Sequence, residues 1–173
     1  GKDPGALGKT GPKEKDVVLD IAKRLKSILK RKGIKVYMTR DSDEFITLKR
    51  RTEIAREKKT DLFIRIHANA SPARGAHGME VLSISDLDKF ERNEVQRKVN
   101  EQKYFQHLNM NTDEKSVVNI VNDILYTNKQ KESHEAASKI ISRTSKVTRT
   151  KSRGTKQARF FVLRNTVMPA ILV

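Results

Sequence analysis

Two amphipathic helices are predicted in the first third of the chain. Apolar residues recur every three or four positions between Glu14 and Gly33, with lysine or arginine between them. Gly33 supplies a C-terminal stop, since glycine readily adopts the left-handed conformation that ends many helices. A second helix is predicted over residues 47–58, where apolar residues again share one face. Both apolar faces should lie on a sheet.

Short β-rich or apolar runs predict five strands. They fall at residues 34–39, 61–67, 78–84, 159–163 and 169–173. The second run, "DLFIRIH", is compact and apolar and ends in a histidine. Because strands alternate with helices in the first half of the chain, the order favours an α/β fold with a largely parallel sheet.

The middle of the chain interrupts this pattern. Residues 86–130 are polar and rich in charged and amide side chains, with a stronger apolar helix face at residues 117–125. We predict an inserted helical segment on the surface here. A further helix is predicted over residues 132–146, followed by a basic loop over residues 148–156.

The net charge of +16 predicts attraction to polyanions. Nucleic acid, cell-wall polymers and anionic membrane surfaces all remain open on charge alone. The chain has no recognised nucleic-acid reader motif, and three Tyr, six Phe and no Trp offer few rings for base stacking. We therefore expect no nucleic-acid partner. The basic residues between Lys139 and Arg164 are interpreted mainly as a solvated surface.

The absence of cysteine excludes disulfides and thiolate catalysis, so any metal site must use histidine and carboxylates. No apolar run approaches the ~20 residues that a membrane span requires. The chain starts in a Gly/Pro-rich loop rather than a secretory signal, so we expect its start to be a cut end. Its 173 residues suit one domain, and we expect a monomer.

Two residues are candidates for chemistry. His67 ends an apolar strand, and Glu14 begins a helix after a Gly-rich loop. Each has an ordinary explanation, since a strand-end histidine often only forms hydrogen bonds and an acid in the first turn complements the helix dipole. Together they would suit a His/carboxylate zinc site. Such a site needs a third ligand, and residues 1–13 offer only Asp3.

Five motifs occur in a fixed order along the chain. They are the helix start with Glu14, "MTR" at 38–40, "L-x-x-R-x-x-x-A" at 48–55, "IHANA" at 66–70 and "MPAILV" at 168–173. Together they resemble the amidase-3 type of N-acetylmuramoyl-L-alanine amidase, over essentially the whole chain except about residues 86–130. The resemblance implies a three-layer α/β/α domain with a mostly parallel, mixed central sheet and a helical insertion.

The resemblance also implies zinc-dependent hydrolysis of the amide between N-acetylmuramic acid and L-alanine in peptidoglycan. Glu14 matches the carboxylate zinc ligand and His67 the second histidine ligand. The first histidine ligand is expected just before Gly1, and the general-base glutamate just after Val173. We therefore expect the chain by itself to be a poor or inactive catalyst, and its parent protein to be active.

Two residues near His67 are candidate substrate contacts. Asn69 matches a family position that binds substrate or orients a ligand. Arg65 stands where the family commonly has a small serine, and it shares a strand face with His67. Arg65 is open to three interpretations: harmless variation, a charge that disfavours zinc, or a grip for a substrate carboxylate. Arg40 and Arg51 are interpreted first as structural ion-pair formers with neighbours such as Asp41, Asp43 and Asp61, and second as substrate contacts.

The inserted segment resembles a regulatory helix that covers the zinc in some family members until an activator protein removes it. The alternative is a plain helical hairpin on the surface. An acidic side chain would plug the metal site, and the candidates here are Asp86, Asp88, Glu91 and Glu94.

Two functions follow from these observations. The first is a zinc amidase of cell-wall remodelling and daughter-cell separation, exported to the periplasm or cell envelope. The second is a non-catalytic, amidase-like module that binds cell-wall polymer.

Overall fold

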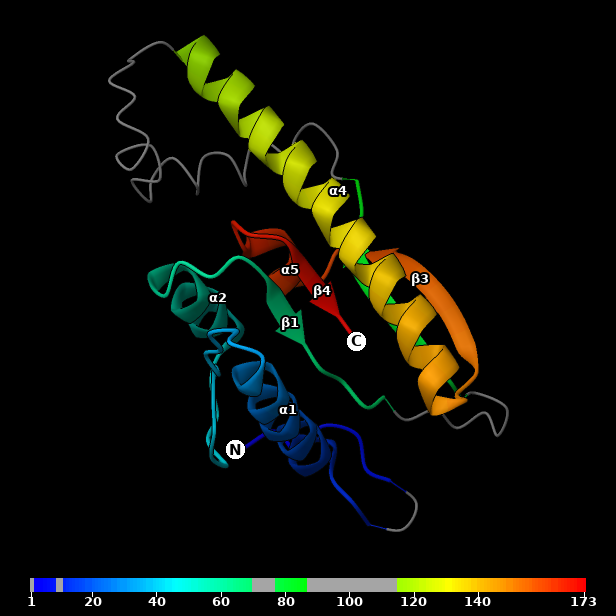
Figure 1. The fold of residues 1–173 in the computed structure, drawn as a ribbon. Helices are drawn as coiled ribbons and strands as arrows, with labels where there is room; N and C mark the ends of the chain where they lie inside the picture. Colours follow the sequence, from blue (N-terminus) through cyan, green and yellow to red (C-terminus); the bar gives the residue numbers. More distant parts are fainter. Residues whose placement is uncertain (1, 9–10, 70–76, 87–114) are drawn as a thin grey trace.

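The computed structural model describes residues 2–8, 11–69, 77–86 and 115–173. Three helices and four strands make up most of the described part, and a fourth, short helix precedes the last strand (Figure 1). In chain order they are α1 (Glu14–Arg31), α2 (Leu48–Glu57), β1 (Phe63–Arg65), β2 (Met79–Ile84), α4 (Lys115–Thr148), β3 (Ser152–Ala158), α5 (Phe161–Asn165) and β4 (Ala170–Leu172). None of the described helices is long and apolar enough to span a membrane.

The described strands form one mixed sheet in the order β1-β4-β2-β3. β1 pairs with β4 in parallel, and β2 pairs with β3 in parallel. The two halves meet where β2 and β4 run antiparallel, with Leu82 opposite Leu172. The prediction of a mostly parallel, mixed sheet is confirmed.

Helices cover both faces of this sheet. Alternate residues of β4 point to opposite sides, so Ala170 and Leu172 join one core cluster and Ile171 joins the other. The first cluster also contains residues of α2 and α5, and the second contains Ala137 and Ile141 of α4. Figure 1 shows the long α4 lying across the sheet, with α1 and α2 grouped at the opposite side. The three-layer α/β/α prediction is therefore confirmed.

The helices predicted at residues 14–33 and 47–58 are confirmed as α1 and α2. The strand predicted over residues 34–39 is wrong. β propensity alone does not make a strand, because a ladder needs a neighbour with matching hydrogen bonds. The segment instead lines a cavity beside β1, and it forms no ladder with any described strand.

Two predictions near the C-terminus are also wrong. Residues 148–156 are not all loop, since β3 begins at Ser152 and pairs with β2. Glu80 of β2 stabilises this pairing through Lys156 Nζ at 2.6 Å and Arg153 Nε at 3.1 Å. Residues 159–163 do not form a strand, because α5 occupies Phe161–Asn165. A short apolar run does not distinguish a strand from a helix.

One continuous helix replaces the two predicted around residues 117–125 and 132–146. α4 runs over 34 residues, and from Tyr126 onward one stripe of it is buried. The predicted surface insertion is therefore wrong for residues 115–130, which form the first half of α4. Of the predicted inserted segment, residues 87–114 lie outside the described residues.

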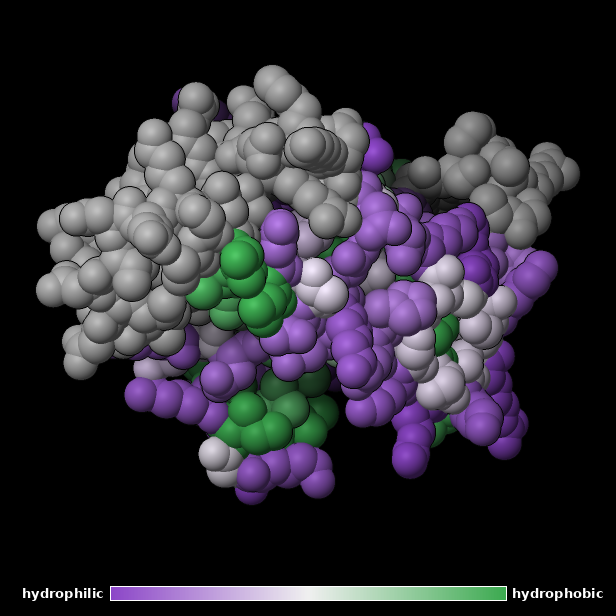
Figure 2. All heavy atoms as spheres, turned by 90° about the horizontal axis from the view of Figure 1, so that it is seen from above, coloured by the Kyte–Doolittle hydropathy of each residue, from purple (hydrophilic) through white to green (hydrophobic). Residues whose placement is uncertain are grey.

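The surface in Figure 2 is mostly hydrophilic, with hydrophobic residues in small patches among the described residues of this view. This matches a chain in which 34% of residues are charged.

Candidate functional site

Glu14 is the first residue of α1, and the chain before the helix holds its carboxylate. The backbone N–H of Ala6 donates to Oε2 at 2.9 Å, and Ala68 N–H donates to Oε1 at 3.0 Å. The backbone N–H of Glu14 itself donates to Ala6 O at 2.9 Å. Two loops that are far apart in sequence therefore fix the orientation of this side chain.

The start of α1 is also tied to the loop that follows residue 39. Lys15 Nζ donates to Asp43 Oδ2 at 2.6 Å, and Arg40 Nη2 donates to the carbonyl oxygen of Lys15 at 2.6 Å. The Lys15 hydrogen bond lowers the pKa of Asp43 to about 2. These contacts restrain the helix turn that carries Glu14. No local sequence pattern predicts these contacts, because they depend on how α1 and the loop meet.

Gly5 makes room for the carboxylate. It has φ +68°, which favours glycine, and a Cβ placed there would lie 2.5 Å from Glu14 Oε2. With glycine at position 5, the loop can therefore approach Glu14 more closely than it could with any other residue there.

His67 reaches the same place from the end of β1. Its backbone N–H donates to Val173 O at 2.7 Å, which extends the pairing of β1 with β4 past the last strand residue. Its Nδ1 lies 2.9 Å from Glu14 Oε1. The structure thus brings together the two residues that the sequence predicted as metal ligands, and both are largely buried.

The protonation states of the pair follow from their surroundings. Burial raises the pKa of Glu14, but hydrogen bonds from Ala6, Ala68 and His67 outweigh it, so the net pKa lies below its usual value. Burial lowers the pKa of His67, and the positive charge of Arg65 lowers it further. The pair is therefore an ionised carboxylate beside a neutral imidazole.

The charge states of Glu14 and His67 determine which ring nitrogen of His67 carries the proton. An ionised carboxylate only accepts hydrogen bonds, so Nδ1 of His67 must carry the imidazole proton. Nε2 then keeps its lone pair, and it is buried with no hydrogen-bond partner among the described residues. Because the two ring nitrogens point in divergent directions, an ion shared with Glu14 Oε1 would bind His67 at Nδ1 in place of the proton, and Nε2 would stay outside the shared site.

A zinc ion fits this donor set, because metals bind deprotonated carboxylates and neutral imidazoles. The set is incomplete within the described ranges, which contain no group of three or more His, Cys, Asp or Glu residues that could hold a metal. Asp3 does not join the pair, since its Oδ1 accepts from Gly5 N–H at 2.9 Å. Glu14 and His67 could therefore supply two of the three protein ligands that a catalytic zinc site uses.

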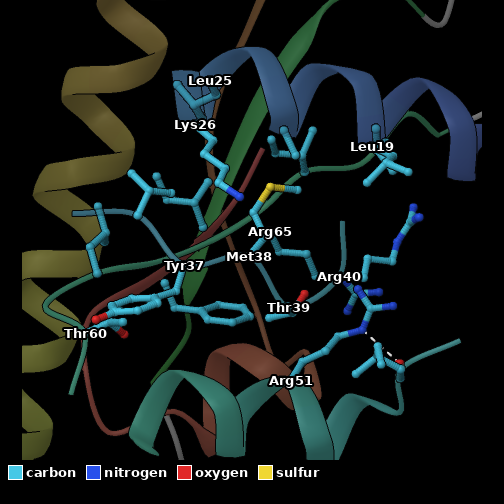
Figure 3. A pocket seen from close by; sticks show the side chains of 18 of the residues that line it. Leu19, Leu25, Lys26, Tyr37, Met38, Thr39, Arg40, Arg51, Thr60 and Arg65 are labelled. Carbon is cyan, nitrogen blue, oxygen red and sulfur yellow. Dashed lines mark hydrogen bonds between the residues drawn. The ribbon is translucent and has the colours of Figure 1, made fainter. Parts of the chain in front are cut away.

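A cavity of about 750 Å³ opens beside the pair, between α1 and β1 (Figure 3). Apolar residues of α1 line one side, and residues 34–40 line another. Arg40 and Arg51 lie close together at one end, and Tyr37 and Thr60 lie at the other. The cavity therefore joins an apolar slot to a strongly basic end near Glu14 and His67.

The predicted ion pairs of Arg40 and Arg51 are not formed with the described aspartates. Arg40 instead donates to the carbonyl oxygens of Ser42 and Lys15, and Arg51 Nε donates to Ile46 O at 3.0 Å. Burial lowers the pKa of Arg51, and the charges of Arg65 and Arg40 lower it further. The guanidinium groups of these three arginines therefore share one electrostatic environment.

Arg65 lies in the cavity and is partly buried. Its side chain forms no hydrogen bond or ion pair with another described residue, and burial lowers its pKa, opposed by the charge of Glu14. The prediction that Arg65 lies near His67 is thus supported by their electrostatic interaction. A partly desolvated guanidinium without a close partner is suited to bind an anion.

The structure describes only two of the remaining candidate residues, Asn69 and Asp86. Asn69 is exposed, two residues after His67. Asp86 follows β2, and its Oδ1 accepts from Gln130 Nε2 of α4 at 2.6 Å. Asp88, Glu91 and Glu94 lie outside the described residues, so their role as plugs stays a prediction.

Comparison with known proteins places this geometry in context. Residues 1–173 match the family model Amidase_3, described as N-acetylmuramoyl-L-alanine amidase. The chain is similar to the N-acetylmuramoyl-L-alanine amidase AmiA of Escherichia coli (strain K12), with 34% identity over 175 residues, covering 100% of the chain and 61% of that relative. It therefore spans less than two thirds of the length of AmiA.

Solved structures agree. The amidase AmiC2 of Nostoc punctiforme matches with 33% identity and a TM-score of 0.61, covering 99% of this chain and 71% of that chain. An N-acetylmuramoyl-L-alanine amidase from Clostridium difficile 630 matches with 26% identity and a TM-score of 0.68, covering 99% of this chain and 72% of that chain.

Proposed function

The chain belongs to the N-acetylmuramoyl-L-alanine amidase family, and on this premise we propose that it is part of a zinc-dependent peptidoglycan amidase. The bond cut would be the amide between N-acetylmuramic acid and L-alanine. The observation that carries the proposal is the contact of 2.9 Å between Glu14 Oε1 and His67 Nδ1.

Glu14 and His67 would hold the zinc in this proposal. Bound zinc lowers the pKa of a water ligand and polarises the scissile carbonyl. Ala6 and Ala68 keep the carboxylate of Glu14 ionised and oriented through their backbone N–H groups. Burial and Arg65 keep His67 neutral, which is the form that binds metal. The resemblance assigns the third ligand and the general base to residues outside 1–173.

Arg65 and Asn69 would contact the substrate. Peptidoglycan stem peptides carry carboxylates, and a guanidinium binds a carboxylate with two parallel hydrogen bonds. Arg65 supports this role because it lines the same cavity as His67 and forms no hydrogen bond or ion pair with another described side chain. Asn69 is exposed two residues after His67, and its role rests on the family position that it matches.

We also propose a cellular role, a location and a mode of regulation for the enzyme. The enzyme would act in wall remodelling and daughter-cell separation, in the periplasm or cell envelope. The part of the predicted insertion that precedes α4, about residues 86–114, would restrain it until an activator protein binds. The polar, acid-containing sequence of this segment supports that role.

A non-catalytic wall-binding module is the second candidate. The positive charge of Arg65 close to the proposed metal ligands favours it, since a nearby cation opposes binding of a dication.

Dye release from purified, labelled sacculi separates the two functions. The intact protein should release dye, lose this activity on treatment with a chelator, and regain it when zinc is added. Glu14→Gln should abolish release while leaving sacculus binding in place, with the exposed Glu135→Gln as the control. Binding to sacculi without release by the intact wild-type protein would favour the wall-binding module.

A further inference from the structure

Lys129 is a buried lysine on the inner stripe of α4. It is 5% exposed and lies between Tyr126 and Ala137, which belong to the two apolar core clusters. A lysine is almost never fully buried unless its ammonium has partners. The metal site and the proposed reaction make no use of it.

The ammonium group of Lys129 holds the end of α5. Its Nζ donates to the carbonyl oxygens of Leu163 at 2.7 Å, Arg164 at 3.2 Å and Thr166 at 2.5 Å. The last carbonyls of a helix lack partners within the helix and carry partial negative charge. Burial lowers the pKa of Lys129 to about 7. The three acceptors oppose this effect, because only the protonated form has three N–H groups.

Ser133, one turn further along α4, holds the start of β4. Its hydroxyl donates to Lys129 O at 2.6 Å and accepts from Ala170 N–H at 3.0 Å. Ser133 is fully buried. Lys129 and Ser133 therefore fix both ends of the turn that runs from Thr166 to Ala170.

β4 connects this turn to the metal ligands. Leu172 lies opposite Arg65 in the parallel pairing of β4 with β1. Beyond it, Val173 N–H donates to Arg65 O at 2.8 Å, and Val173 O accepts from His67 N–H at 2.7 Å. A shift of β4 by one residue would turn each of its side chains to the other face and move these backbone contacts.

We propose that Lys129 and Ser133 are positioning residues, which hold the register of β4 and thereby place the backbone of His67 beside Glu14. The positioning role depends on the proposed function only in the experiment that measures amidase activity. A purely structural role would stabilise the whole domain, whereas the positioning role acts selectively on β4 and on the end of β1.

Native-state hydrogen exchange on the intact protein separates these roles. The variant Ser133→Ala removes the hydroxyl that binds Ala170. Its control is Ser142→Ala on the same helix, where an exposed hydroxyl donates to Lys139 O at 3.1 Å. The amides followed are those of Ala170, Val173 and His67. The reference is the amide of Met79, which bonds to Lys151 O away from β4.

In Ser133→Ala the three site amides should exchange about tenfold faster, while Met79 and the control variant stay at the wild-type rate. On sacculi, kcat should fall about tenfold at an unchanged KM. Equal acceleration at Met79, unchanged exchange at His67 and Val173, or a kcat equal to that of Ser142→Ala would each overturn the proposal.

Lys129→Met, with the exposed Lys139→Met as its control, should produce the same pattern more strongly. If Lys129→Met does not fold, the Ser133→Ala result decides alone. The exchange pattern also decides the proposal if the intact wild-type protein proves to have no amidase activity, which would refute only the proposed function.

Discussion

Gly5 lies against Glu14 so closely that a single added Cβ would come within 2.5 Å of the carboxylate oxygen Oε2. The loop can pass at this distance only because glycine has no side chain and tolerates φ +68°. The position of a candidate metal ligand thus depends on a residue that carries no functional group.

Replacing Gly5 with alanine should therefore damage the metal site more than the fold. Alanine at positive φ costs about 1–2 kcal/mol of stability, and the contact with Glu14 adds displacement of the carboxylate. We expect zinc affinity, measured by calorimetric titration of the intact protein, to fall about tenfold or more.

Gly33→Ala is the matched control, because Gly33 also has positive φ but an added Cβ meets nothing within 4 Å. It should lose similar stability in thermal unfolding and keep wild-type zinc affinity. Equal zinc affinity in both variants would remove Gly5 from the account of the site.

Arg65→Met should raise the pKa of His67. Burial is the largest cause of the lowered pKa of His67, and the charge of Arg65 is the next. A nearby cation disfavours the protonated imidazole, so removing it allows protonation at higher pH. We expect the pKa of His67 to rise, measured by NMR titration of the imidazole in zinc-free protein.

Metal binding changes in the opposite sense, because Arg65 repels a zinc dication more strongly than it repels a single proton. Arg65→Met should therefore bind zinc more tightly than the wild type and keep it to a lower pH, although a protonated imidazole cannot bind zinc. The control is Arg24→Met, an exposed residue paired with Asp20. If Arg65 grips a substrate carboxylate, KM on sacculi also rises. A lowered or unchanged His67 pKa would contradict the electrostatic role.

Deleting roughly residues 86–112 from the intact protein should raise its basal activity, because the proposed plug would be gone. Dye release without any activator is the measurement. Substituting Asp88, Glu91 and Glu94 with their amides one at a time should identify the plugging residue. An unchanged or lower rate in a folded deletion variant would count against regulation by this segment.

The sequence predicted the parts of the fold in which local pattern and tertiary contacts agree. α1, α2 and the cores of β1, β2 and β4 lie where the periodicity placed them. The prediction from sequence failed where pairing with another segment of the chain determines whether a strand forms. Residues 34–39 have β propensity but no ladder with a described strand, whereas β3 forms from a basic segment because Glu80 of β2 offers it a counter-charge.

The residues of the candidate site also divide into those that local sequence position predicts and those that depend on tertiary contacts. Glu14 and His67 could be named from their positions at a helix start and a strand end, and from the order of motifs around them. Gly5, Lys15 and Lys129 could not. Their roles depend on contacts that span 9 residues from Gly5 to Glu14, 28 from Lys15 to Asp43 and 37 from Lys129 to Thr166, which no local pattern records.

The central claim is that Glu14 and His67 share one zinc ion. Anomalous diffraction at the zinc edge from crystals of the intact protein tests it most directly. The account predicts one strong peak per chain, within roughly 2.0–2.2 Å of a Glu14 carboxylate oxygen and a His67 ring nitrogen. A zinc peak elsewhere, or a zinc-saturated crystal in which these two side chains still contact only each other, would contradict it.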